Sequence, residues 1–405
     1  MTPRSPLEPH RAATPLELFF DLVFVVAIAI AAGGLHHGVA EGHAAEAVVG
    51  YVMAFFGIWW AWMNFSWFAS AYDTDDVPYR LAVLLQMTGA LIFAAGLPAM
   101  AEGHFLVGVV GYVIMRLAMV GQWLRAAAGD PSHAQAARRY ALGITVVQVA
   151  WVLYLWIPVA WQVPGFFFLV LCELSVPVWA ERASPTPWHP GHMAERYGLF
   201  TIIVLGESIL AATVAVQSAL EGGAVLNEVL GVVVGGLLIV FSLWWLYFDR
   251  PMDDLLTSFR RVFVWAYGHL LVFASAAAVG AGLAVAVDQA THHAEIGRAM
   301  AGAAVAVPTA IYLVSLRMLH GWPAEGGTRF LGLVSAGLIL LTPFTGQAVL
   351  LTGLLLAGLL AVKLVGGQGG SAAVSRQVSS GVQGPIQIGP WRRSVAAPGV
   401  SSRGP

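Results

Sequence analysis

Residues 59–76 read WWAWMNFSWFASAYDTDD, and residues 244–254 in the second half of the chain read WWLYFDRPMDD. Both stretches open with a tryptophan pair, continue with aromatic residues and close with an aspartate pair. An arginine follows each of them, Arg80 and Arg261, and each arginine opens a further apolar segment. These matches predict that one set of helices is repeated. A duplicated helical membrane protein places its working site at the seam between the copies.

The composition defines the broad class of protein. The chain has 405 residues, of which 58% are hydrophobic and 10% are charged, whereas a soluble domain carries about 25% charged residues. We therefore predict an all-α, polytopic membrane protein whose first partner is the lipid bilayer. The net charge of −2 argues against a nucleic-acid partner. The single cysteine, Cys172, allows no intramolecular disulfide.

A helical span needs about 20 apolar residues, and the sequence holds about twelve such segments. The eleventh is short, and the pair around Pro343 reads alternatively as a re-entrant hairpin, which leaves ten or eleven spans. The predicted spans are 16–35, 47–70, 80–100, 104–125, 138–158, 163–182, 197–219, 226–248, 261–286, 298–320, 328–342 and 345–365.

Basic residues gather in the even-numbered turns and in both tails, while the odd-numbered turns hold Arg298 and no other arginine or lysine. The positive-inside rule then places both termini in the cytoplasm. Six spans per repeat is an even number, so the two repeats are predicted to run parallel. The predicted parts are an N-terminal cytoplasmic segment 1–13, repeats 14–182 and 194–365, a proline-rich linker 183–193 and a disordered cytoplasmic tail 366–405.

Two long motifs carry a family resemblance. Residues 14–25 read TPLELFFDLVFV, and residues 192–208 read HMAERYGLFTIIVLGES. They resemble the two signatures of the bacterial low temperature requirement protein A family, and with the span pattern the likeness covers about residues 12–365. The resemblance implies a multi-pass protein of the bacterial plasma membrane and carries no substrate with it.

A weaker likeness concerns a family of potassium channels that also has two six-span repeats. That family opens its first span with Phe-Ser-Asp, and Phe19-Phe20-Asp21 stands in a comparable place here. The serine is replaced, and the second copy has Gly198-Leu199 where the motif would recur. This departure puts channel activity in doubt.

Ionisable residues inside a span mark candidate sites. Thr14, Pro15 and Glu17 fit a capping box, which explains Glu17 as a helix-start residue, and Glu195 holds a similar place in the second copy. Asp21 lies one turn beyond Glu17 on the same helix face. It is either an ion-pair partner of a loop arginine such as Arg196 or Arg80, or part of a permeation or coupling site.

Three further charges are predicted at one depth near the bilayer centre, namely Arg116, Glu173 and Glu207. They read either as a structural triad or as a site in which Arg116 pairs with one carboxylate and the other carries a proton or cation. His269 lies nearby in the ninth span, where a hydrogen-bonded packing role is the competing interpretation.

Other polar and aromatic groups have simpler interpretations. Several histidines fall on the predicted outer face, where loop exposure competes with pH sensing or metal collection; they are His36, His37, His43, His104, His292 and His293. The tryptophans of 59–67 and 244–247 read as interfacial aromatic belts. No phosphate-binding glycine loop, dinucleotide fingerprint or His-Glu-x-x-His motif is present, so no cofactor is predicted and an enzyme is the less favoured class.

Three functions remain open at this point. The leading one is a secondary transporter or ion-conducting protein for a small ion or solute, with Asp21 and Glu207 as first site residues and Arg116 and Glu173 as their electrostatic partners. The second is a membrane enzyme acting on a lipid-linked or phosphorylated substrate at Asp75-Asp76, Asp253-Asp254, His189 and His192. The third is a sensor or scaffold without turnover. The sequence gives neither the substrate nor the oligomeric state.

Overall fold

A computed structural model describes residues 1–6, 8, 11–223, 226–249, 256, 259–320 and 330–379. Residues Met1–Leu360 form one compact unit and Ala361–Pro405 a second. The described residues form α-helices and one 3₁₀ helix, and they contain no strand. In chain order the elements are α1 (Pro15–Ala40), α2 (Ala44–Tyr72), α3 (Val77–Ala101), α4 (Leu106–Gly129), α5 (Ala134–Tyr154), α6 (Val159–Glu181), α7 (Pro190–Glu221), α8 (Leu226–Phe248), α9 (Phe259–Ala290), α10 (Arg298–His320), α11 (Leu331–Ile339), η3 (Thr342–Thr345) and α12 (Ala348–Ser379).

Ten of the helices in the described ranges are long and apolar enough to cross a membrane. The protein is therefore an all-α, polytopic membrane protein, as predicted. The two others fall short for different reasons. The first half of α5 carries Arg138 and Arg139 among small and polar residues. The nine residues of α11 rise only about 14 Å, which agrees with the prediction of a short eleventh segment.

Most helix ends differ from the predicted spans by a few residues, and two of these differences change the predicted linker and tail. α7 begins at Pro190, inside the predicted linker, because proline is well tolerated at the first position of a helix. α12 continues to Ser379, beyond the predicted end of the last span at residue 365. The rest of the predicted disordered tail lies outside the described residues.

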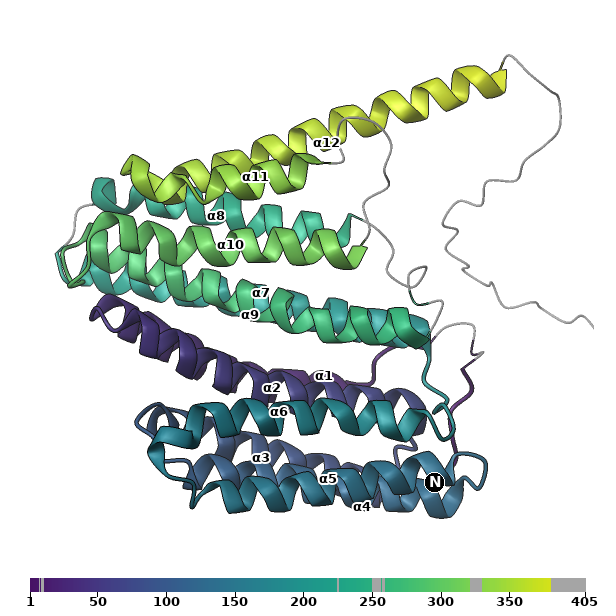
Figure 1. Cartoon of the computed structure of the whole chain (residues 1–405). Helices are drawn as coiled ribbons and strands as arrows, with labels where there is room; N and C mark the ends of the chain where they lie inside the picture. The colour runs from purple at the N-terminus through teal and green to yellow at the C-terminus, as the bar shows by residue number, and fades with distance from the viewer. Residues whose placement is uncertain are drawn as a thin grey trace, which may run out of the picture. The chain divides into compact units, whose positions relative to one another are not determined.

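In the first unit, α1 and α2 lie between two groups of helices (Figure 1). Both helices contact α3 on one side and both contact α7 and α9 on the other. Within the groups, α3 packs along α4, α5 joins α4 to α6, and α9 packs along α10. The chain's own first two helices therefore supply the contact surface between its two halves.

The α3–α4 contact depends on glycine. A Cβ built on Gly89 would lie 2.7 Å from the carbonyl oxygen of Gly111, and one built on Gly111 would collide with the backbone of Phe93 and lie 2.6 Å from the carbonyl oxygen of Gly89. Small residues at such positions let membrane helices approach closely. The backbones of α3 and α4 are thus in direct contact.

A Gly111→Leu substitution should therefore destabilise the protein, by about 1–3 kcal/mol or more, because the added side chain forces α3 and α4 apart. The matched control is Gly121→Leu on the same helix, where a Cβ would meet no atom within 4 Å. Thermal melting in detergent should show a lower midpoint for Gly111→Leu alone. Equal midpoints for the two variants would contradict the close contact.

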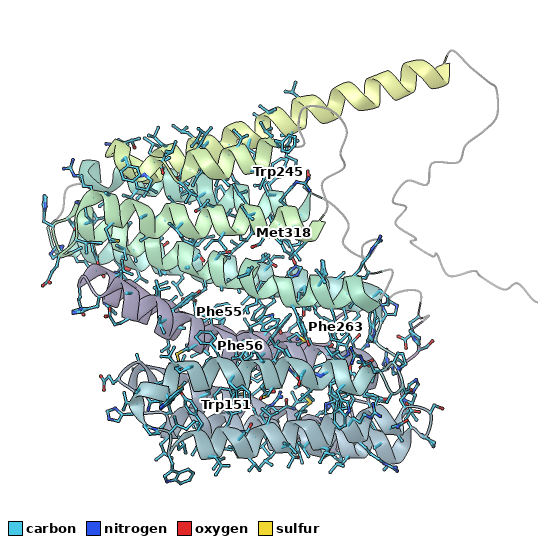
Figure 2. All side chains as sticks on the ribbon, in the orientation of Figure 1. Phe55, Phe56, Trp151, Trp245, Phe263 and Met318 are labelled. Atoms are coloured by element: carbon cyan, nitrogen blue, oxygen red, sulfur yellow. The ribbon has the colours of Figure 1, made fainter. Side chains whose placement is uncertain are left out.

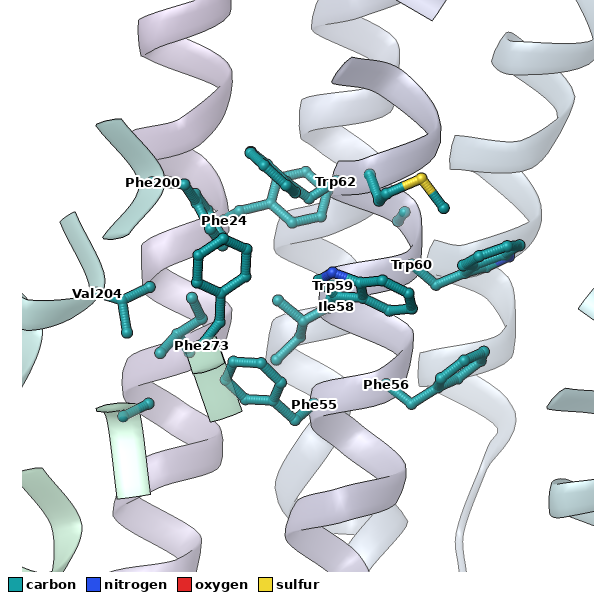
Figure 3. Packing of buried hydrophobic residues seen from close by; sticks show 14 of the residues in the cluster. Phe24, Phe55, Phe56, Ile58, Trp59, Trp60, Trp62, Phe200, Val204 and Phe273 are labelled. Carbon is teal, nitrogen blue, oxygen red and sulfur yellow. The ribbon is translucent and has the colours of Figure 1, made fainter. Parts of the chain in front are cut away.

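The centre of the core is aromatic and belongs to α2. Every residue from Met53 to Tyr72 is buried. Trp62 stacks on Phe200 of α7 with ring centroids 4.2 Å apart, and Phe20 of α1 stacks on Phe65 at 3.8 Å. Each such pair contributes about 0.5–1.5 kcal/mol beyond its buried area. Figure 3 shows Trp59, Trp60 and Trp62 pointing away from one helix in several directions.

This arrangement corrects the interpretation of residues 59–67 as an interfacial belt. Trp59, Trp60 and Trp62 are at most 1% exposed. Trp60 lies twelve residues before the end of α2, which is roughly 18 Å from that end and too deep for a belt. Trp244 and Trp245 are 46% and 44% exposed and fit the belt interpretation. Figure 2 labels Trp245 together with the buried residues Phe55, Phe56 and Trp151.

Candidate functional site

An ion pair and a carboxylate–imidazole contact join α1 to α7 inside the protein. Arg196 Nη2 donates to Oδ1 of Asp21 at 2.7 Å, and His192 Nε2 lies 3.1 Å from Oε1 of Glu17. All four side chains are fully buried. Glu17 and Asp21 are four residues apart on α1, as His192 and Arg196 are on α7, so each helix presents both of its charges on one face. We call these four residues the α1–α7 charge ladder.

The start of each helix sets the height of the ladder. The predicted capping box is present, since Thr14 N donates to Glu17 Oε2 at 2.8 Å and Glu17 N donates to Thr14 Oγ1 at 3.3 Å. On α7, His189 is the N-cap and its Nδ1 accepts from His192 N at 3.1 Å. Glu195 therefore lies in the second turn of α7, half-buried, and not at the helix start.

The aromatic helix α2 completes the environment of Asp21 and Arg196. Trp62 Nε1 donates to Oδ1 of Asp21 at 2.7 Å, and Arg196 Nη2 also reaches Ser66 Oγ at 3.3 Å. The guanidinium lies 5.9 Å from the ring centres of Trp62 and Phe65, within cation–π range. Of the two arginines predicted as partners of Asp21, Arg196 is the one that pairs with it. The part that α2 plays in this contact was not predicted from the sequence.

Several polar atoms of the charge ladder have no hydrogen-bond partner among the described residues. They are Oδ2 of Asp21, Nδ1 of His192, and Nε and Nη1 of Arg196, whereas Oε1 of Glu17 and Nε2 of His192 face each other at 3.1 Å. Buried polar groups are normally hydrogen-bonded, and exceptions point to function or to a bound water or ion. Oδ1 of Asp21 accepts two hydrogen bonds, from Trp62 and Arg196. Oδ2 accepts none among the described residues and is left to interact with a small ion, a proton or water.

The N-terminal segment closes the end of the bundle next to the ladder. Buried Arg11 donates through Nη2 to the carbonyl oxygen of Ala69 at 2.6 Å and through Nη1 to that of Ser70, at the C-terminal end of α2. His189 Nε2 lies 2.8 Å from the carbonyl oxygen of Glu8. Burial lowers the pKa of Arg11 from its usual value and raises the pKa of nearby Asp73. The predicted segment 1–13 is therefore packed against the helix ends along the described part of its length.

A second buried ion pair lies within the first half of the chain. Arg116 of α4 donates through Nη2 to Oε2 of Glu173 on α6 at 2.6 Å, and both side chains are at most 3% exposed. Trp60 Nε1 donates to the same oxygen at 2.8 Å, and Trp151 Nε1 donates to Oε1 at 3.2 Å. Glu173 therefore accepts three hydrogen bonds, which suits a structural carboxylate.

An apolar cavity of about 40 Å³ lies beside this second pair, lined in part by Tyr112 and Trp151. The ring of Tyr112 is 5.8 Å from the guanidinium of Arg116. Trp60 and Trp62 are two residues apart and so point to opposite sides of α2. One helix thus separates the Arg116–Glu173 pair from the charge ladder and hydrogen-bonds to both.

Glu207 does not join Arg116 and Glu173. It lies on α7, half-buried, and makes no hydrogen bond or ion pair within the described ranges. The next residue, Ser208, packs on α9, where its Oγ donates to the carbonyl oxygen of Ala276 at 2.9 Å. The three charges predicted at one depth thus separate into a pair in one half of the chain and a single carboxylate in the other.

His269 of α9 is buried and hydrogen-bonded. Its Nδ1 lies 2.7 Å from the carbonyl oxygen of Trp265, and its Nε2 lies 3.1 Å from the hydroxyl of Tyr247. Tyr197 packs edge-on against the imidazole with ring centres 4.9 Å apart. These contacts agree with the packing interpretation of this residue.

The acidic residues considered for an enzyme are held by arginines. Arg80 makes two hydrogen bonds to Asp75, at 2.7 and 2.6 Å, and Arg125 makes two to Asp76, at 3.0 and 2.7 Å. The hydrogen bonds from Arg80 lower the pKa of Asp75. The hydrogen bond from the backbone N–H of Tyr79 and the contacts with Arg125 lower the pKa of Asp76. Asp253 and Asp254 lie outside the described residues. Within the part of the chain that the structure describes, no three His, Cys, Asp or Glu residues come together as a metal site would need.

Of the predicted outer histidines, His36 makes the clearest contact. Its Nε2 lies 2.6 Å from Oδ2 of Asp288, which connects α1 to α9 at the end of the bundle away from the charge ladder. His104 lies 3.8 Å from Glu102, and both side chains are largely exposed. His36 therefore joins two helices, and His104 is an exposed loop residue.

Comparison with known proteins places the chain in a family without reference to the predicted six-helix repeats. The family model for the bacterial low temperature requirement A protein (LtrA) matches residues 12–367. The class defined by the fold is a multi-pass helical membrane protein with buried ion pairs, and the chain belongs to the LtrA family.

An uncharacterised protein of Rhizobium meliloti (strain 1021), designated RA0937, is 28% identical over 271 residues. The alignment covers 63% of this chain and 64% of that relative, so the chain matches somewhat less than two thirds of the relative's length. No solved structure matches the chain.

Proposed function

We propose that this protein moves a small cation or a proton across the bacterial plasma membrane, and that the α1–α7 charge ladder is the place where the ion acts. The observation that carries the proposal is the fully buried Asp21–Arg196 pair, in which Oδ2 of Asp21 has no hydrogen-bond partner among the described residues. Charges are rare within membrane spans and mark ion pathways when they occur.

The chemistry of the pair supports a switching role. A cation or proton bound at Oδ2 neutralises Asp21 and weakens its attraction for Arg196. Glu17 lies one turn away on the same face of α1, where its Oε1 faces Nε2 of His192 at 3.1 Å. Arg196 then has a second carboxylate to pair with. Exchange of Arg196 between Asp21 and Glu17 would give the α1–α7 contact two states, which is the element that coupled transport requires.

The competing interpretation is a lock that only holds α1 to α7. A buried ion pair is weak evidence for stability, because its desolvation often offsets the attraction and apolar residues can serve as well. Both arginines have an unpartnered Nε among the described residues, but both oxygens of Glu173 accept hydrogen bonds, as a lock would need. Oδ2 of Asp21 accepts none among the described residues, and this difference favours the transport role.

The larger arrangement belongs to the proposal too. α1 and α7 would be the first helices of two parallel six-helix repeats, 14–182 and 194–365, with both termini in the cytoplasm. The contacts of α1 and α2 with both halves and the arginines of the even-numbered turns support it. Glu207, a carboxylate further along α7 without an ion-pair partner among the described residues, is the second candidate on the route.

The proposal is tested by flux through proteoliposomes that contain the purified full-length chain. Wild-type protein should dissipate an imposed gradient of H⁺, Na⁺ or K⁺ faster than empty vesicles do. Asp21→Asn should lower that rate at least about tenfold, a barrier change near 1.4 kcal/mol. Glu102→Gln, a change to an exposed turn residue, is the control that should keep the rate. Wild-type vesicles as tight as empty ones to all three cations, or full flux in Asp21→Asn, would overturn the proposal.

A further inference from the structure

A polar hollow of about 360 Å³ lies at the end of the helices remote from the charge ladder. It is bounded by residues near the starts of α8, α10 and α12 and near the end of α9. Its polar lining consists of Gln289, His292, Arg298 and Gln347. The volume falls at the small end of the range of ligand sites, about 300–1,000 Å³.

Arg298 is the charged group of this hollow. Its side chain is exposed and makes no hydrogen bond or ion pair within the described parts of the chain. No carboxylate is among the described residues that line the hollow. The acidic residue Asp288 near the end of α9 is already engaged by His36, at 2.6 Å. None of the described lining residues therefore neutralises the positive charge of Arg298.

The remaining lining groups add hydrogen-bond donors. The side-chain amides of Gln289 and Gln347 each carry an NH₂ group. The first intrahelical bond of α12 runs from Leu351 N to the carbonyl oxygen of Gln347, so the amides of the three residues between them have no partner in the helix. Two of those residues, Val349 and Leu350, line the hollow. These amide donors lie beside the guanidinium of Arg298 in the lining of the hollow.

Close packing between α10 and the start of α12 fixes the helices beside the hollow. A Cβ on Gly302 of α10 would lie 2.6 Å from Cβ of Ala348 and 3.0 Å from Cα of Pro343. This contact fixes the start of α12 against α10. Gly346, with φ of 77°, provides the turn that precedes α12. The donors are therefore carried by a fixed framework and not by a free loop.

We propose that the hollow binds a small oxyanion from solution, a carboxylate or a phosphate, with Arg298 as its principal ligand. An arginine fork matches the two oxygens of such a group. Arg298 is also the single arginine or lysine in the odd-numbered turns, so the attraction for anions on this face is concentrated at one point. The site is separate from the charge ladder, and its test does not require transport.

The test is equilibrium binding of succinate and of inorganic phosphate to the purified full-length chain, with uncharged succinamide as the negative probe. Succinate or phosphate should bind saturably, and Arg298→Gln should weaken binding at least about tenfold. Arg298→Lys, which keeps the charge and loses the fork, should fall between the two. Arg182→Gln, at another exposed and unpaired arginine, is the matched control and should bind as the wild type does.

Two further measurements keep the outcome clear. Phenylglyoxal should label Arg298, succinate should protect it, and the unliganded melting midpoint of Arg298→Gln should equal that of the wild type, which excludes misfolding. Nanodiscs of phosphatidylglycerol and of phosphatidylcholine separate a lipid headgroup from a free solute. Succinate binding that is lost in phosphatidylglycerol nanodiscs but kept in phosphatidylcholine nanodiscs would assign the hollow to lipid and overturn the proposal. No saturable binding below about 1 mM for either anion would overturn it as well.

Discussion

Replacing Arg196 by glutamine should lower the free energy of unfolding by about 3–5 kcal/mol, because the carboxylate of Asp21 then stays buried without its cation. Both side chains are completely buried, and the distance between them is 2.7 Å. Trp62 would still donate to Asp21, but a neutral indole N–H does not replace a guanidinium charge. The loss should appear as a lower midpoint of thermal unfolding in detergent.

The control is the double variant Asp21→Asn with Arg196→Gln. Removing both charges removes the uncompensated one, so the double variant should recover most of the stability lost by Arg196→Gln. A midpoint that falls by the sum of the two single changes would show that the side chains do not interact. Arg182→Gln, which removes an exposed arginine, should leave the midpoint within about 0.5 kcal/mol of the wild-type value.

Glu173→Ala should be similarly damaging, at about 3–5 kcal/mol, because it leaves Arg116 as an unpaired buried cation. It also removes the acceptor for the indole N–H groups of Trp60 and Trp151, and each unsatisfied buried donor adds about 1–3 kcal/mol at most. Thermal melting measures the effect.

Two comparisons separate the charge from the packing. Glu173→Gln keeps an oxygen for the two indoles and loses the ion pair, so it should fall between Glu173→Ala and the wild type. Cys172→Ala changes the neighbouring residue, which is only partly buried, and should have a small effect. A Glu173→Ala protein as stable as Cys172→Ala would contradict the paired arrangement.

The sequence predicted the features that depend on local pattern. Apolar segments of span length follow from composition, and ten such helices are present in the described ranges. Thr14, Pro15 and Glu17 form the predicted capping box because a cap involves neighbours along the chain. The short eleventh segment was visible because the apolar stretch that precedes Pro343 is too short for a span. Membership of the LtrA family followed from two continuous motifs.

The parts of the candidate site that depend on contacts between helices distant in the chain could not be predicted from the sequence. Depth along a helix can be counted in residues, and it placed Arg116, Glu173 and Glu207 at one level. The direction in which each side chain points, and which helices adjoin, cannot be counted in that way. Glu173 therefore meets Arg116, while Glu207 lies on a helix of the other half.

The role of α2 was missed for a related reason. Its tryptophans were interpreted by type, as residues that favour the membrane interface, although counting back from Tyr72 puts Trp60 well inside the span. Their two-residue spacing was the available signal, because Trp60 and Trp62 must then point to opposite sides of the helix. One indole serves Glu173 and the other serves Asp21.

The most direct test of the transport role is cation flux through the charge-free double variant, Asp21→Asn with Arg196→Gln. This variant separates a site from a lock, since it should fold with near wild-type stability while lacking the carboxylate that receives the ion. The account predicts a melting midpoint close to that of the wild type together with flux no faster than that of empty vesicles. A stable double variant that conducts at the wild-type rate would contradict it.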